Sequence, residues 1–282
     1  TPALNLGIEV TTHWDNSSPE PPLTFSPTAI SADGTARMFI AIDKKAGKTN
    51  TIQHVKITAE DNALANQTVN YVGKIKGATT VNTYTEEANN LTQNTDILTA
   101  PNWFGSYYFY YVAPDDFDRG LSGINSDKFS GRRKIKLKIE TTYVGITNPE
   151  VTDFYIDIVR PPLMFVHGLG GDESTWDNLQ FKMGFSGYKH FISATSIFQA
   201  GIQVNNMYKG ASFLQNAQVL LGFDVTKTEN SFQHLLNEAH KKGICANRVD
   251  YVCHSMGGSM IRTVINKYPN LYRPSVASNA SF

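Results

Sequence analysis

The feature that most constrains the fold of this chain is a change of hydrophobic pattern at Arg160-Pro161-Pro162. Before it, apolar and polar residues alternate, which is typical of half-solvated strands. After it comes a continuous apolar run, Leu163-Met164-Phe165-Val166, as in a strand buried on both faces of a parallel sheet. Because proline cannot donate to a strand ladder, we expect a linker here and two domains, residues 1–160 and 161–282.

The first domain is expected to be an all-β sandwich. Apolar residues alternate over 38–42, 135–139 and 154–158, and residues 107–112 form an aromatic-rich strand just before Pro114. Almost no segment before residue 160 shows a helical period. The spacing of these strands, with the turn signal Asp33-Gly34 just before the first of them, fits a sandwich.

The second domain shows the order strand, helix, strand, helix. Phe232, Leu235, Leu236 and Ala239 keep the spacing of an amphipathic helix, and Gly243 is its expected end. Residues 249–253 are predicted to form a strand, followed by a helix that ends before Pro269. This order predicts a parallel sheet with flanking helices.

Charge gives no reason to expect a nucleic-acid or anionic-membrane partner, since 25 Lys and Arg balance 25 Asp and Glu. No run reaches the 18 or so apolar residues of a membrane span. Polarity comes mainly from Asn, Thr and Ser, a mixture common in extracellular proteins, so we expect a secreted or cell-surface location. Cys245 and Cys253 are too few for a disulfide framework, and their pairing stays open.

Ser255 is the candidate nucleophile. It lies in His254-Ser255-Met256-Gly257-Gly258, directly between the predicted strand 249–253 and the predicted helix. A sharp turn of this kind, a nucleophile elbow, lifts a serine hydroxyl above the sheet, and small residues allow the backbone to turn. The Met256 N–H, at the start of the helix, would then face a developing oxyanion.

A glycine-rich loop, His167-Gly168-Leu169-Gly170-Gly171, follows the buried strand 163–166. Together the segments RPP, FVHGLGG, ASF with NA, and RVDYVCHSMGG resemble the α/β-hydrolase family, more narrowly its secreted bacterial lipases and esterases. The resemblance covers roughly residues 160–282, and it implies that the Leu169 N–H is the second oxyanion donor. The first domain is faintly similar to bacterial Ig-like modules.

The sequence departs from that family in two ways. Cys253 occupies the position of the first glycine of G-x-S-x-G, where a small thiol fits. More seriously, no Asp, Glu or His follows Ser255, whereas the family places its triad acid and base there. We therefore expect the hydrolase domain to be truncated after the helix that follows Ser255.

The predicted function is hydrolysis of carboxylic esters, including lipids, through an acyl-enzyme on Ser255, without a cofactor. One alternative is a catalytically inert protein that binds or attaches to surfaces through the β-sandwich. Another is an acyltransferase, amidase or thioesterase on the same site. In each case the first domain could contact a surface or polymer.

Other polar residues carry weaker hypotheses. His167 is expected to hydrogen-bond backbone and position its loop, and the His254 side chain to point away from Ser255. Asp115, Asp116 and Asp118 are expected to be solvated rather than to bind Ca²⁺, and no Cys/His spacing for zinc is present. Residues 198–207 are where substrate contacts would be sought, although the substrate-binding residues are unknown.

Overall fold

The computed structural model describes residues 7–14, 26–78, 92–101, 105–122, 127, 130–168, 176, 178, 213–221 and 231–268. Up to residue 160, these residues are almost entirely strands and their connections, with one short helix. The elements of this part are β1 (Ile8–Trp14), β2 (Ala29–Ser31), β3 (Arg37–Lys44), β4 (Ile52–Glu60), α1 (Val69–Val72), β5 (Lys74–Gly77), β6 (Thr95–Leu98), β7 (Tyr107–Val112), β8 (Arg132–Tyr143) and β9 (Glu150–Val159).

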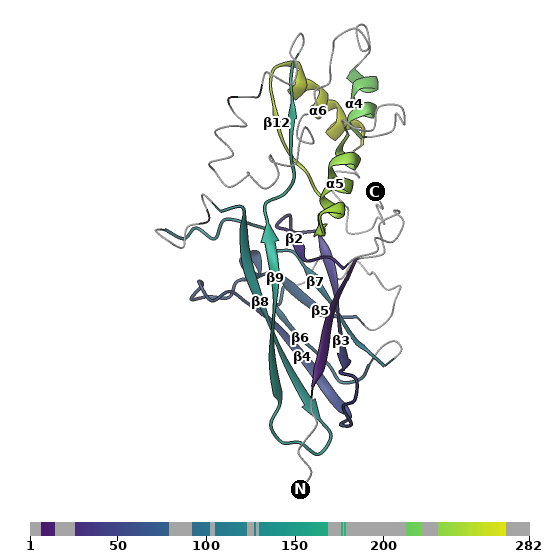
Figure 1. Cartoon of the computed structure of the whole chain (residues 1–282). Coiled ribbons are helices and arrows are strands. Elements are labelled where there is room, and N and C mark those ends of the chain that lie inside the picture. The colour runs from purple at the N-terminus through teal and green to yellow at the C-terminus, as the bar shows by residue number, and fades with distance from the viewer. Residues whose placement is uncertain are drawn as a thin grey trace.

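Beyond residue 160, the chain forms short strands and helices, most of which extend from one end of the strand-rich part (Figure 1). The elements are β10 (Leu163–Val166), α4 (Phe213–Leu221), α5 (Phe232–Lys241), β11 (Ile244–Cys245), β12 (Asp250–Cys253) and α6 (Met256–Lys267). None of the described helices is both long and apolar enough to cross a membrane.

Two sheets pack face to face over one apolar core in the strand-rich part. One sheet has the order β1-β3-β7-β5 and is antiparallel, and the other has the order β11-β2-β9-β8-β4-β6 and is mixed. The alternation predicted for 38–42, 135–139 and 154–158 is confirmed, because Met38, Ile135 and Ile156 are buried between less buried neighbours, with the period of the pleat. Leu137 and Ile139, on β8, are fully buried in the same core.

The predicted fold class is wrong for the second part of the chain. An α/β-hydrolase core needs a multi-stranded parallel sheet, but in the described residues 163–168, 213–221 and 231–268 only β10 and β12 pair as a separate parallel sheet. The two larger sheets are antiparallel and mixed. Most of the described elements are strands, and the described chain is therefore mostly β. The continuous apolar run 163–166 is indeed a buried strand, but burial on both faces does not determine how many strands lie beside it.

A shared layer of three strands, β11, β2 and β9, joins the two parts. β2 pairs in parallel with both of its neighbours. One side of this layer contributes to the sandwich core, and its other side contributes to the core beneath α4, α5 and α6. The side chains on the first side are Ile30, Ile158 and Cys245; those on the second are Ala29, Val159 and Ile244. The two cores therefore share one sheet edge.

A buried group of charged side chains stabilises the sandwich near the connection to β10. The Arg119 guanidinium donates to both oxygens of Asp61 at 2.9 and 2.8 Å and to both oxygens of Asp127 at 2.7 Å. Arg133 adds bonds to Asp61 and to backbone carbonyls. Arg160, at the start of the connection to β10, donates to the Asp127 carbonyl oxygen at 2.8 Å.

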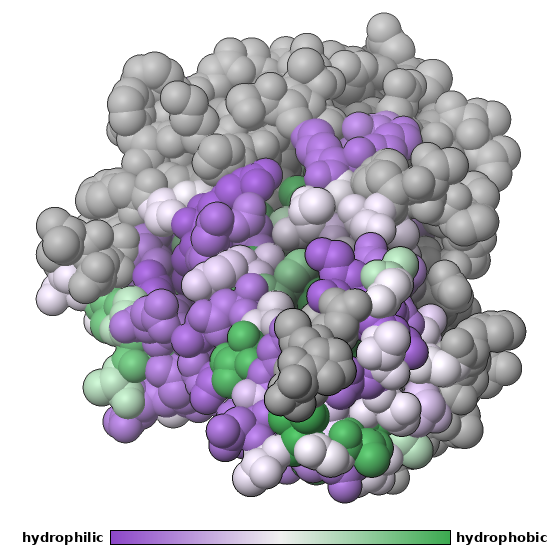
Figure 2. Space-filling model, turned by 60° about the horizontal axis from the view of Figure 1, so that its bottom comes forward, coloured by the Kyte–Doolittle hydropathy of each residue, from purple (hydrophilic) through white to green (hydrophobic). Residues whose placement is uncertain are grey.

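The surface seen from the lower end of the sandwich is mainly hydrophilic (Figure 2). Among its described residues, the hydrophobic ones form small separate areas between hydrophilic ones. Three of the most exposed large hydrophobic residues of the described chain, Val144, Val151 and Tyr155, are on β9 or in the turn between β8 and β9. Single exposed residues of this kind are normal on a solvated surface.

Candidate active site

Ser255 lies between the end of β12 and the start of α6, as the sequence predicts. Its backbone angles are φ 53° and ψ −124°, and no other non-glycine residue in the described part of the chain has a positive φ. Such a conformation costs an L-residue of order 1–3 kcal/mol and persists only where the surrounding structure enforces it. The residue itself is exposed.

The Ser255 hydroxyl does not serve the helix that it precedes. Within the described residues its side chain makes no capping hydrogen bond. Ser231, at the start of α5, is the opposite case: it has φ −109° and ψ 160°, is buried, and its Oγ accepts the His234 N–H at 3.1 Å. Of these two serines that precede helices, only Ser231 caps its helix.

Two glycines enforce the turn. A Cβ at Gly168 would lie 2.7 Å from the Ser255 Cβ and 3.2 Å from its Oγ, so the residues after β10 approach the serine as bare backbone. A Cβ at Gly257 would lie 2.3 Å from the Val166 carbonyl oxygen, so only glycine allows α6 to begin so close to β10. The His254 N–H donates to the same Val166 oxygen at 3.0 Å and continues the pairing of β10 with β12.

The two expected oxyanion donors have different outcomes. Met256 is the first residue of α6, and its N–H has no acceptor among the described residues, so it stays a candidate donor. Leu169 lies outside the described residues, and its role stays a prediction, as do the substrate contacts sought at 198–207.

His167 makes the backbone hydrogen bond expected of it. Its ring is fully buried, and Nδ1–H donates to the Gly168 carbonyl oxygen at 2.8 Å. This bond fixes the residue that touches Ser255. The other ring nitrogen, Nε2, is buried without a hydrogen-bond partner among the described residues.

Sequence reasoning missed Trp176. Its indole packs on Phe165 of β10 with ring centroids 5.3 Å apart, and it meets the His254 ring edge-on at 6.5 Å. Its Nε1 is also buried, with no partner in the described part of the chain. Only an apolar pattern in the region around residue 176 could have indicated this contact, and a single tryptophan between polar residues gives none.

Cys253, which precedes His254, is a poor competing nucleophile. Burial raises the pKa of its thiol to about 11, so it is almost wholly protonated at neutral pH. It forms no disulfide with Cys245, which lies in the sandwich core.

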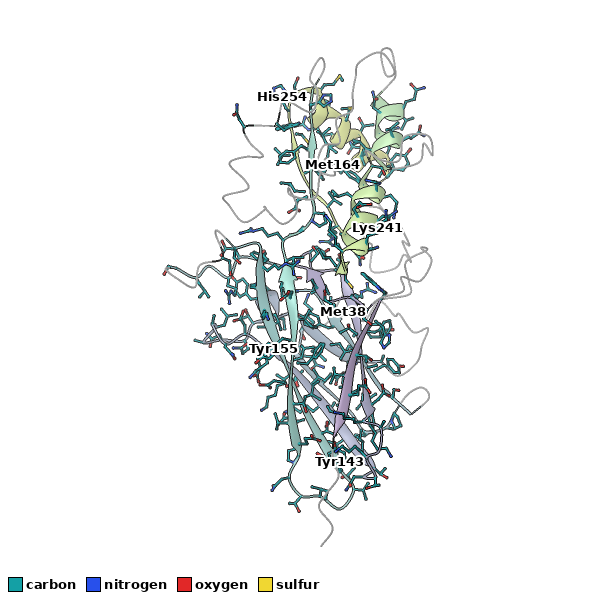
Figure 3. The ribbon with its side chains drawn as sticks, viewed as in Figure 1. Met38, Tyr143, Tyr155, Met164, Lys241 and His254 are labelled. Atoms are coloured by element: carbon teal, nitrogen blue, oxygen red, sulfur yellow. The ribbon has the colours of Figure 1, made fainter. Side chains whose placement is uncertain are left out.

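Figure 3 places His254 at the end of the β10–β12 pair remote from the sandwich, beyond Met164.

A proton acceptor for Ser255 is not seen in the described part of the chain. No histidine or carboxylate there is hydrogen-bonded to its hydroxyl. Likewise, no group of three or more His, Cys, Asp or Glu side chains in that part is placed to hold a metal ion. Asp115 instead pairs with Lys74 at 3.2 Å.

No family model matches this chain. No curated protein matches it either. Solved structures that match include a conjugative transposon lipoprotein from Bacteroides eggerthii, at 11% identity and a TM-score of 0.26, covering 55% of this chain and 98% of the other. A conjugate transposon protein from Bacteroides vulgatus matches at 13% identity and a TM-score of 0.26, covering 56% and 87%. The major pilin subunit of Bacillus cereus matches at 10% identity and a TM-score of 0.26, covering 59% and 45%.

These findings correct the family assignment. The resemblance to α/β-hydrolases of the secreted bacterial lipase and esterase type, with an Ig-like module before them, is wrong: no family model matches the chain, and its described part is mostly β, with β10 and β12 as the one separate parallel pair among those residues. The physical reason is that HGLGG and HSMGG specify two local backbone turns, which do not by themselves determine the sheet around them.

Proposed function

We propose that this protein is a serine-dependent carboxylic-ester hydrolase with Ser255 as nucleophile. The observation that carries the proposal is the backbone of Ser255, held at φ 53° between a strand and a helix with its hydroxyl exposed and not used as a cap. Outliers of this kind cluster at functional sites, because a strained turn can present a reacting group in a fixed position.

The reaction would run in two steps. Ser255 Oγ attacks the ester carbonyl while its proton passes to a base, and the tetrahedral intermediate expels the alcohol, which takes up a proton. Water then attacks the acyl-serine and releases the acid and the free hydroxyl. The Met256 N–H, with the Leu169 N–H as second donor, would stabilise the negative oxygen in both steps. The base is the group that the described residues do not supply.

Labelling with a fluorophosphonate probe tests the proposal, because the probe phosphonylates activated serines. The intact mass of the full chain should rise by one adduct, and peptide analysis should place it on Ser255. Ser255→Ala should lose the adduct, whereas Ser259→Ala, an exposed serine one turn further along α6, should keep it. The same three proteins should show the same order in hydrolysis of p-nitrophenyl butyrate.

The lack of a base among the described residues favours one alternative, a catalytically inert protein that binds through its β-sandwich. Its signature would be a folded chain in which Ser255 takes up no probe. An acyltransferase, amidase or thioesterase would instead label at Ser255 and be separated by offering acceptor alcohols, amides or thioesters. A secreted or cell-surface location, proposed from the residue composition, is tested by fractionating the cells that produce the protein.

A further inference from the structure

The connection between β11 and β12 is held to the sandwich by a small hydrogen-bonded group, Asp33, Thr35 and Asn247. The Asn247 N–H donates to Asp33 Oδ2 at 3.1 Å, and its side-chain Nδ2 donates to the Thr35 carbonyl oxygen at 3.0 Å. These residues are more than 200 positions apart in sequence. Asp33 is buried, and its other oxygen accepts the N–H groups of Thr35 and Ala36.

This contact lies at the base of the strand that carries Ser255. β11 is paired to β2 of the sandwich, and only residues 246–249 separate it from β12. The chain on the other side is equally short, because residues 160–162 alone connect β9 to β10. The Asp250 N–H donates to the Pro162 carbonyl oxygen at 2.8 Å and ties the two connections together.

Additional contacts hold the sandwich to the segment around α5 and β11, close to this connection. The N–H groups of Thr28 and Ala29 both donate to the Gly243 carbonyl oxygen, at 2.9 and 3.1 Å. The Trp14 ring of β1 lies 5.4 Å from the His240 ring of α5. In Figure 1, β2 lies directly below the end of α5, and β12 extends away from this level toward α6.

We infer that Asp33 and Asn247 are positioning residues for the Ser255 turn: they fix the connection between β11 and β12, and through it the end of β12 against β10. This inference rests on the proposed function for its chemical readout, but its structural readout is independent. It makes the sandwich a part of the site's framework rather than a separately moving module.

Three variants of the full chain separate this role from general stability. Asp33→Asn keeps Oδ1 for Thr35 and Ala36 but turns an N–H toward the Asn247 N–H. Asn247→Ala removes only the bond to the Thr35 carbonyl. Thr35→Val is the matched control, because it removes the Thr35 hydroxyl bond to Asp33 Oδ1, at 3.0 Å, and leaves both bonds of Asn247 in place.

Amide hydrogen exchange is the first measurement. Asp33→Asn and Asn247→Ala should raise exchange across 246–257, which includes the Asp250, His254 and Gly257 amides, by about tenfold or more, while the β4 and β8 amides keep their protection. Thr35→Val should leave 246–257 unchanged. Unchanged exchange in both Asp33→Asn and Asn247→Ala would overturn the inference, whatever the reactivity of Ser255.

Probe labelling is the second measurement. A positioning role predicts that Asp33→Asn slows labelling of Ser255 several-fold while the final extent stays at one adduct per chain. A merely structural role would lower the final extent in proportion to unfolded protein, and that result would also overturn the inference. If the unaltered chain takes up no probe, the proposed function fails, and the exchange experiment still decides the inference.

Discussion

Replacing Ser255 with glycine should make the protein more stable. Glycine adopts a positive φ at no steric cost, so Ser255→Gly releases the strain of the φ 53° conformation. That strain is of order 1–3 kcal/mol. Glycine also gains about 0.5–1 kcal/mol of freedom in the unfolded chain. The difference predicts a free energy of unfolding up to about 2.5 kcal/mol higher than that of the unaltered protein.

Two further serine variants calibrate the measurement. Ser255→Ala keeps a Cβ at positive φ and removes an exposed hydroxyl, so the free energy of unfolding should change by less than about 0.5 kcal/mol. Ser231→Ala removes the cap of α5 and leaves the His234 N–H without its 3.1 Å partner. It should cost about 1 kcal/mol. Urea unfolding followed by circular dichroism, compared at equal m-value, measures all three.

The order of stability tests the reasoning about the turn. We expect Ser255→Gly to be the most stable, Ser255→Ala and the unaltered chain to be nearly equal, and Ser231→Ala to be the least stable. If Ser255→Gly loses as much stability as Ser231→Ala, the Ser255 turn is not strained and its hydroxyl supports the helix. The structural argument for a nucleophile would then be refuted.

Four other outcomes follow from named contacts. Gly257→Ala should lower the free energy of unfolding by about 1–3 kcal/mol, because its Cβ would lie 2.3 Å from a β10 carbonyl oxygen. Gly258→Ala should not lower it, because the nearest atom to its Cβ would be 3.9 Å away. Equal urea midpoints for the two variants would contradict this prediction. Arg119→Leu should cost about 3–5 kcal/mol in urea unfolding, since it leaves the buried Asp127 carboxylate without a guanidinium partner and leaves Asp61 with Arg133 alone. A loss below about 1 kcal/mol would argue against the burial of Asp127. Burial raises the pKa of Asp127, but hydrogen bonds and charge from Arg119 outweigh burial and leave that pKa lowered. The contribution of the Asp127 carboxylate to the free energy of unfolding is therefore fully present above about pH 4 and is lost as the pH falls through the folded-state pKa. Measuring the urea midpoint at decreasing pH should show this loss, and the pH dependence should be smaller in Arg119→Leu. Alkylation of Cys253 by iodoacetamide should rise about tenfold per pH unit from about pH 8 to 10, and a plateau near pH 9 would contradict a pKa of about 11.

Strands and helices with a clear period could be predicted from the sequence. The alternation over 135–139 is the buried face of β8, and the helical spacing of Phe232, Leu235, Leu236 and Ala239 is the buried face of α5. These signals are local, because each depends only on which side of one element is covered. The position of Ser255 between a strand and a helix was predictable for the same reason.

The sheet topology could not be predicted. β11 has two residues, too few to show any period. It is nevertheless the edge strand of the six-stranded sheet, and its side chains contribute to both cores. The hydrogen bond between Asp33 and Asn247 depends on the pairing of β11 with β2, and neither residue carries a motif that indicates the other. The parallel α/β-hydrolase sheet was predicted from the order of strands and helices, the apolar run 163–166 and two glycine-rich turns, and none of these sets the number of neighbouring strands.

The close packing at the start of α6 explains why a strained serine can persist there. If Gly257 and Gly168 carried side chains, α6 and the residues after β10 would be pushed apart, and Ser255 could relax toward the conformation of an ordinary cap such as Ser231. The two glycines instead hold backbone against backbone, with the His254 N–H bonded to Val166. A serine kept at positive φ by such contacts does not cap the helix that it precedes, and a backbone conformation of this kind is the reason for proposing Ser255 as a nucleophile.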